Sequence, residues 1–156
     1  MLRAQAMGKH TVQRYMSIGP VVISSDRSIA EAHRVMRERG IRHLPVVDEG
    51  KLVGMLTQRD LYLVETLKGI DPSAERVREA MSAEPYAVAP DAPLDVVAEA
   101  MAARKLGSAV VVDRGVVIGV FTTVDALRAL SAIVRRRRER PDDERNVADE
   151  RRRPDS

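Results

Sequence analysis

The stretches GMLTQRD, at residues 54–60, and GVFTTVD, at residues 119–125, share one pattern. In each of them a glycine precedes two apolar residues and a threonine, and an aspartate stands three positions after the threonine. Apolar residues followed by Thr-x-x-Asp are typical of a strand that leads into a helix, with the threonine as the helix cap. We therefore expect two strand-to-helix junctions, and their recurrence indicates a repeated unit.

The two stretches lie within a longer internal repeat. A shift of 65 residues superimposes the two halves of the chain without a gap. The identities under this shift include Met16-Ser17 with Met81-Ser82, Pro20 with Pro85, Asp26 with Asp91, Met36 with Met101, Val46-Val47-Asp48 with Val111-Val112-Asp113, and Gly50 with Gly115. Since they fall at turns and apolar positions in one register, the sequence indicates a duplication.

The repeat divides the chain into two units and a tail. We predict a first unit at 11–68, a turn-rich linker at 69–76 and a second unit at 77–134. Two copies are too few for a solenoid, so each unit is expected to cover an apolar face of the other. Residues 135–156 hold nine Arg and seven acidic residues. This tail is expected to be disordered, or helical only for its first turn or two.

The apolar spacing predicts the same five elements in both units. In the first unit these are a strand within 20–25, a helix over 28–40, strands at 43–48 and 51–57, and a helix from about Thr57. In the second unit they are a strand within 85–90, a helix over 93–105, strands at 109–113 and 116–122, and a helix over 122–134. Ser28 with Glu31 is a candidate capping box, Gly40 a helix stop, and Asp48-Glu49-Gly50 a hairpin turn. The expected fold class is α+β, with the order β-α-β-β-α written twice.

The composition excludes several classes of protein. The chain has no Cys, which rules out disulfides and thiolate chemistry, and only 3% of its residues are aromatic. No apolar run approaches the roughly 20 residues that cross a bilayer, and the N-terminus lacks the apolar stretch of a signal peptide. We expect a cytoplasmic protein without membrane contact. Residues 135–156 carry two of the three net positive charges, so the folded part has no basic bias toward nucleic acid.

The Thr-x-x-Asp motif has two interpretations. In the first, Thr57 and Thr122 only cap helices, and Asp60 and Asp125 return a hydrogen bond. In the second, a helix N-terminus offers N–H groups to a phosphate, and the carboxylate accepts the two hydroxyls of a ribose. The occurrence of the motif in both units at one register favours a nucleotide site.

Four segments carry a resemblance to a known family. Residues 41–61 (IRHLPVVDEGKLVGMLTQRDL), 107–127 (GSAVVVDRGVVIGVFTTVDAL), 16–36 (MSIGPVVISSDRSIAEAHRVM) and 81–101 (MSAEPYAVAPDAPLDVVAEAM) resemble paired CBS domains, named from cystathionine β-synthase. The resemblance covers about residues 11–134. It rests on the order of the elements, the spacing of the motifs and the positions of the turn residues together.

This resemblance implies a fold and a ligand. The two β-α-β-β-α units would pack as a pseudo-two-fold pair with two clefts between them, and such pairs commonly dimerise. In the family these clefts bind AMP, ADP, ATP or S-adenosylmethionine. The implied nucleotide-binding residues are Thr57, Asp60, Arg42 and His43 in the first unit, and Thr122, Asp125, Gly107 and Ser108 in the second. The aspartates would hold ribose, and the other residues would approach phosphate.

The two implied clefts differ in chemistry. Val110 stands where the first unit has Pro45, and Gly107-Ser108 stands where it has Arg42-His43. Because arginine neutralises phosphate, our hypothesis is that the cleft with Arg42 and His43 is the better phosphate site.

The remaining motifs do not indicate catalysis or a metal site. The three histidines have no ligand spacing, and we expect His33 to face solvent on its helix. Asp60 and Asp125 have no second carboxylate or histidine placed for acid–base chemistry, and no catalytic motif or covalent cofactor is indicated.

We therefore predict a regulatory module, not an enzyme, that binds an adenosyl ligand and signals to an effector protein through the shape of a homodimer. One alternative is an adaptor or oligomerisation module with empty clefts. A second alternative is nucleic-acid binding through the Arg-rich tail, against which the interleaved acids argue.

Overall fold

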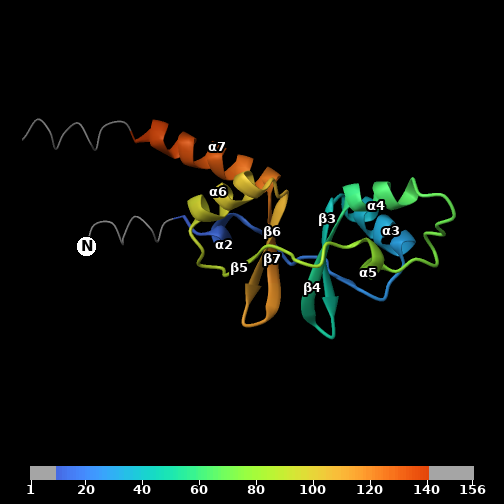
Figure 1. Cartoon of the computed structure of the whole chain (residues 1–156). Helices are drawn as coiled ribbons and strands as arrows, with labels where there is room; N and C mark the ends of the chain where they lie inside the picture. Colours follow the sequence, from blue (N-terminus) through green and yellow to red (C-terminus); the bar gives the residue numbers. More distant parts are fainter. Residues whose placement is uncertain (1–9, 141–156) are drawn as a thin grey trace, which may run out of the picture.

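The computed structural model of the chain describes residues 10–140. Two sheets stand side by side at the centre, and the helices lie on their outer sides (Figure 1). Helices α3, α4 and α5 flank one sheet, and helices α2, α6 and α7 flank the other. This arrangement confirms the predicted α+β class.

The first unit builds a three-stranded sheet and two long helices. Its elements are β2 (Ile23–Ser24), α3 (Ile29–Arg39), β3 (His43–Asp48), β4 (Lys51–Thr57) and α4 (Gln58–Glu65). The strand order is β2-β3-β4, in which β2 runs parallel to β3 and β3 runs antiparallel to β4. The predicted order β-α-β-β-α is confirmed here.

The second unit repeats these elements. They are β5 (Ala87–Val88), α6 (Leu94–Arg104), β6 (Ser108–Asp113), β7 (Val116–Thr122) and α7 (Thr123–Glu139). Helix α7 continues past the predicted unit boundary at residue 134 through the first arginines of the tail. Residues 141–156 of the predicted tail lie outside the described part of the chain.

Local signals set the ends of several elements where they were expected. The Ser28 side chain accepts a hydrogen bond from the Glu31 N–H at 3.2 Å, and helix α3 ends at Gly40 with φ of 62°. The turn between β3 and β4 has positive φ at Glu49 and Gly50 (47° and 78°), as a tight hairpin turn requires. The helix predicted over 93–105 begins one residue later than expected, because Pro93 stands at the N-cap of α6.

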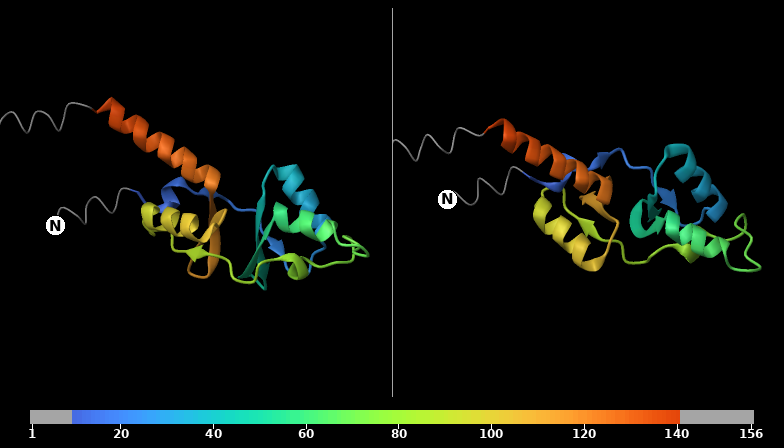
Figure 2. Two further views of the ribbon diagram at one scale, coloured as in Figure 1. Left: turned by 45° about the horizontal axis from the view of Figure 1, so that its top comes forward. Right: turned by 90° about the horizontal axis from the view of Figure 1, so that it is seen from above.

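A short helix precedes each unit, and each of these helices packs on the other unit. They are α2 (Val12–Tyr15) and α5 (Val77–Ala80), which the sequence analysis did not predict. The Val12 N–H donates to the Ala92 carbonyl at 2.9 Å, and the Val77 N–H donates to the Arg27 carbonyl at 2.8 Å. Each folded unit is therefore built from two separate stretches of the chain. Figure 2 shows this for the blue N-terminal segment, which lies beside α6 and α7.

The exchange of these two N-terminal segments, one with α2 and the other with α5, also completes the second sheet and divides the core. Strand β1 (Ser17–Ile18) pairs antiparallel with β7, so this sheet has the order β1-β7-β6-β5. One aliphatic core contains Val77 beside the helices α3 and α4, and the other contains Val12 and Phe121 beside α6 and α7. Burial of apolar side chains of the exchanged segments holds the two units together.

The motif glycines make room for the exchanged segments. A Cβ at Gly54 would lie 2.5 Å from the Met81 sulfur and 2.7 Å from the Ser82 carbonyl oxygen. A Cβ at Gly119 would lie 2.9 Å from the Ser17 carbonyl oxygen and would also meet the Met16 sulfur. Since real Cβ atoms do not approach other atoms so closely, glycine is required at both positions by packing.

Candidate functional site at the junction of the two units

Both Thr-x-x-Asp motifs form complete capping boxes. The Thr57 N–H and hydroxyl each donate to Asp60 Oδ2 at 2.8 Å, and the Asp60 N–H donates to the Thr57 hydroxyl at 3.1 Å. The matching distances for Thr122 and Asp125 are 2.9, 3.0 and 3.3 Å. The predicted helix caps are therefore present in both units, and whether the same residues also bind a nucleotide stays a prediction.

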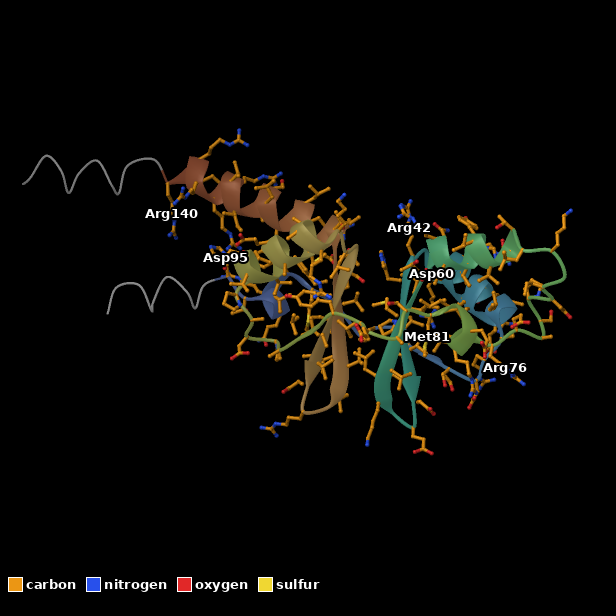
Figure 3. All side chains as sticks on the ribbon, in the orientation of Figure 1. Arg42, Asp60, Arg76, Met81, Asp95 and Arg140 are labelled. Carbon is orange, nitrogen blue, oxygen red and sulfur yellow. The ribbon has the colours of Figure 1, made fainter. Side chains whose placement is uncertain are left out.

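The sheets bring the other predicted residues beside these caps. His43 pairs with Thr57 across β3 and β4, and Ser108 pairs with Thr122 across β6 and β7. Arg42, which precedes β3, is exposed and lies above the start of α4 near Asp60 (Figure 3). Each half thus gathers its four predicted residues at the same end of its hairpin.

The two sets meet at the junction between the units. A Cβ at Gly107 would lie 2.9 Å from His43 Nε2, so the imidazole rests directly on the Gly107 backbone of the other unit. Strands β4 and β7 are also in contact. The His43 ring of the first unit therefore occupies space that a side chain at Gly107 of the second unit would otherwise fill.

The environment of His43 keeps its imidazole neutral. Burial lowers the pKa of His43 below its ordinary value of 6.5, the charge of Arg42 lowers it further, and the charge of Asp60 opposes both. At neutral pH the ring is therefore uncharged and lies beside the Arg42 cation. Among the described residues the Arg42 guanidinium has no ion-pair partner.

The backbone of the helix ends offers less than the sequence suggested. The Gln58 N–H donates to the Arg42 carbonyl at 2.9 Å, and the Thr123 N–H donates to the Gly107 carbonyl at 3.1 Å. The N–H groups of Asp60 and Asp125 are taken by the threonine hydroxyls. Because these first-turn donors are engaged, fewer backbone N–H groups remain at this junction to bind an anion.

Comparison with known proteins assigns the family. The model of the CBS domain matches residues 12–64 and 77–132, which together make up more than half of the chain. The chain belongs to the CBS-domain family. It is 30% identical over 115 residues to the CBS domain-containing protein YhcV of Bacillus subtilis, covering 74% of this chain and 81% of that protein.

Two other similarities concern larger or liganded proteins. The inosine-5'-monophosphate dehydrogenase of Korarchaeum cryptofilum is 35% identical over 106 residues, 67% of this chain but only 21% of the enzyme. The enzyme therefore shares the CBS region and not its whole length. The CBS domain pair of protein MJ0100, solved in complex with 5'-methylthioadenosine and S-adenosyl-L-methionine, is 31% identical with a TM-score of 0.71, covering 78% of this chain and 96% of that chain.

A hollow of about 580 Å³ lies away from the junction of the CBS units. It lies between α6 and α7, and none of the eight predicted residues lines it; the lining residues are His10, Pro93, Leu94, Asp95, Val96, Ala98, Phe121, Ala126, Ala129, Leu130 and Ile133. The corresponding helices of the first CBS unit are bridged, because His33 Nδ1 lies 2.7 Å from Glu65 Oε1. The expectation that His33 faces solvent is wrong, since the ring turns toward α4 and meets Tyr62 edge-on.

Residues 10–140 contain no group of three or more His, Asp or Glu side chains arranged to hold a metal ion. In the same range no helix has the length and apolar character needed to span a bilayer.

Proposed function

We propose that this CBS domain pair is a regulatory module that binds an adenosyl ligand at the junction of its two units. Asp60 accepts the ribose hydroxyls, and Thr57 holds the carboxylate in position. Arg42 and His43 face the phosphate or other charged end of the ligand. In the second unit Thr122, Asp125, Gly107 and Ser108 form the related but less charged site.

One observation carries this proposal. The Asp60 carboxylate uses Oδ2 for the cap, and its Oδ1 makes no hydrogen bond among the described residues. The half-buried carboxylate therefore retains an acceptor atom beside Arg42, which itself lacks an ion-pair partner there. An acceptor for hydroxyls next to a free cation suits a nucleotide better than a purely structural cap does. The complex of the MJ0100 domain pair with two adenosyl compounds supports the same ligand class.

Thermal unfolding in the presence of ligands tests the proposal. AMP, ADP, ATP and S-adenosylmethionine are each added to the full chain. A compound at 100 times its dissociation constant should raise the free energy of unfolding by about 2.7 kcal/mol. Asp60→Asn keeps an oxygen acceptor for the cap but loses the charge, so it should weaken binding at least about tenfold.

The matched control is Asp48→Asn, which removes an exposed carboxylate at the opposite end of the same hairpin. This variant should bind as the wild type does. If none of the four compounds stabilises the wild-type protein, the nucleotide proposal is wrong.

The outer helices support association with a second copy of the chain and with an effector protein. The exposed large apolar side chains of these helices and of the residue shortly after α4 are Tyr62, Leu63, Leu67, Val96, Val124, Leu127, Leu130 and Val134. Contiguous exposed apolar surface marks interaction sites. We propose a homodimer through these helices, whose shape changes with ligand occupancy. Sedimentation of Leu127→Glu tests it, because a charge at a buried interface should yield monomers.

A second candidate function is that of an adaptor whose junction stays empty. The complete capping boxes favour it, because they explain both motifs without any ligand. In that case ligands leave the unfolding temperature unchanged while the dimer persists. Nucleic-acid binding through the Arg-rich segment is tested by deleting residues 135–156, since phosphate contacts give a steep salt dependence.

A further inference from the structure

The carboxylates of Asp60 and Asp125 differ in exposure and in hydrogen bonding. Asp125 is only 5% exposed, whereas Asp60 is half-buried. The Ser17 hydroxyl lies 3.3 Å from Asp125 Oδ1 and 3.5 Å from Oδ2, in position to donate to the carboxylate. Asp125 Oδ2 already accepts the N–H and hydroxyl of Thr122. Both oxygens of Asp125 therefore have hydrogen-bond donors within the protein, one of which is the hydroxyl of the exposed residue Ser17.

The exchanged segment brings Ser17 to this place. Ser17 pairs with Val120 where β1 joins β7, and its carbonyl oxygen lies against Gly119. The contact spans 108 positions of the chain. It exists because the N-terminal segment of one CBS unit packs on the other.

The duplicated position behaves differently. Ser82 exchanges two backbone hydrogen bonds with Met55, at 2.9 and 3.0 Å, so its backbone repeats the pairing of Ser17. Among the hydrogen bonds of residues 10–140, however, none joins the Ser82 hydroxyl to Asp60. The same residue type at the same repeat position therefore covers one carboxylate and leaves the other open.

This difference decides where a ribose can bind. A vicinal diol needs acceptor positions on the carboxylate that are free of protein donors. On Asp60 such a position is open, whereas on Asp125 the ligand must first displace the Ser17 hydroxyl. Losing a hydrogen bond to a charged acceptor lowers affinity by about tenfold or more.

We propose that Ser17 closes the second site, so that each chain takes one adenosyl ligand, at the Asp60 side. This inference rests on the function proposed above. Ser17 acts by occupying the ribose-accepting oxygens of Asp125, and it makes the two halves of the duplication functionally unequal.

Isothermal titration of the full chain with S-adenosylmethionine, and separately with AMP, tests this inference. The wild type should bind one ligand per chain. Ser17→Ala should expose a second site, seen as a stoichiometry of two or as a second phase strengthened at least about tenfold. Ser17→Thr keeps the hydroxyl and should restore a stoichiometry of one.

Ser82→Ala is the matched control, because it removes the duplicated hydroxyl, and it should leave the stoichiometry at one. Asp60→Asn should weaken the single wild-type phase at least about tenfold. Two equal sites in the wild type, or one site in Ser17→Ala, would overturn the inference while leaving the proposed function intact. Absence of any binding by the wild type would instead overturn the proposed function, and this inference with it.

Discussion

The two CBS units of this chain have the same elements and hydrogen-bonding pattern, but they differ at their exposed surfaces. The hairpin turns, the threonine caps and the exchanged segments recur in both halves with nearly identical hydrogen bonds. In the first unit His33 and Glu65 bridge the two outer helices, whereas the matching positions of the second unit are Ala98 and Leu130, and an apolar hollow lies there. The contacts that fold each unit are therefore shared by both halves, whereas the positions between the outer helices differ.

The largest expected effect is a loss of stability when the packing shared by both units is disturbed. Gly54→Val and Gly119→Val each force a side chain into an exchanged segment, and each should lower the free energy of unfolding by about 2–3 kcal/mol. Urea denaturation followed by circular dichroism measures the loss. Similar values are expected, because the exchange is the same in both units.

Gly40→Ala is the control for these two variants. A Cβ at this position meets open space, and only the positive φ of 62° opposes it, so a loss of about 1 kcal/mol is expected. Lys105 adopts φ of 53° at the matching position of the second unit, which shows that this backbone conformation accepts a side chain. A loss at Gly119 no larger than at Gly40 would contradict the packing role of the motif glycine.

A smaller effect tests the chemical difference at the junction. Arg42→Ala should weaken ATP binding about tenfold, because it removes the cation that the second unit lacks at Gly107. Binding of S-adenosylmethionine, which has no phosphate, should change less. Calorimetric titration measures both, with Arg39→Ala as a control on an exposed arginine of α3. Unchanged ATP affinity in Arg42→Ala would remove the hypothesis that this half is the better phosphate site.

The bridge between the outer helices offers a third test. His33→Ala removes the hydrogen bond to Glu65 and should lower the free energy of unfolding by about 1 kcal/mol. Arg34→Ala, on the adjacent exposed position, should change stability by less than about 0.5 kcal/mol. Chemical denaturation compares the two variants, and equal losses would show that the His33 contact contributes nothing specific.

The smallest effect concerns pH. Burial holds the pKa of His43 in the folded protein below its ordinary value of 6.5, so the unfolded chain binds this proton more tightly. The His43 contribution to stability should therefore fall as the pH drops below about 6.5 and level off below the folded-state pKa. Denaturation of the wild type and His43→Gln between pH 5 and pH 8 (roughly the range in which histidine titrates) measures this contribution. His10→Gln is the reference variant. If His43→Gln leaves the pH dependence of stability unchanged, this dependence does not come from His43.

Much of the fold was predictable, because its signals are local. The capping boxes at Thr57 and Thr122 and the stop at Gly40 depend on atoms within a few residues of one another. The helices α2 and α5 were missed, since four residues are too few to show a helical period. The eight predicted site residues are brought together at the junction, but which of them bind a ligand stays a prediction.

The duplication, the order of the elements and the residue types at each cap can be read from the sequence, because turns and caps are encoded by neighbouring residues. The contacts of Ser17 with Asp125, of His43 with Gly107 and of His33 with Glu65 become visible in the folded chain alone. These contacts join segments far apart in the chain, and they depend on the path by which each N-terminal segment crosses to the other unit. The periodicity of a single stretch carries no information about that path, since the crossing is stabilised by apolar burial against a partner surface.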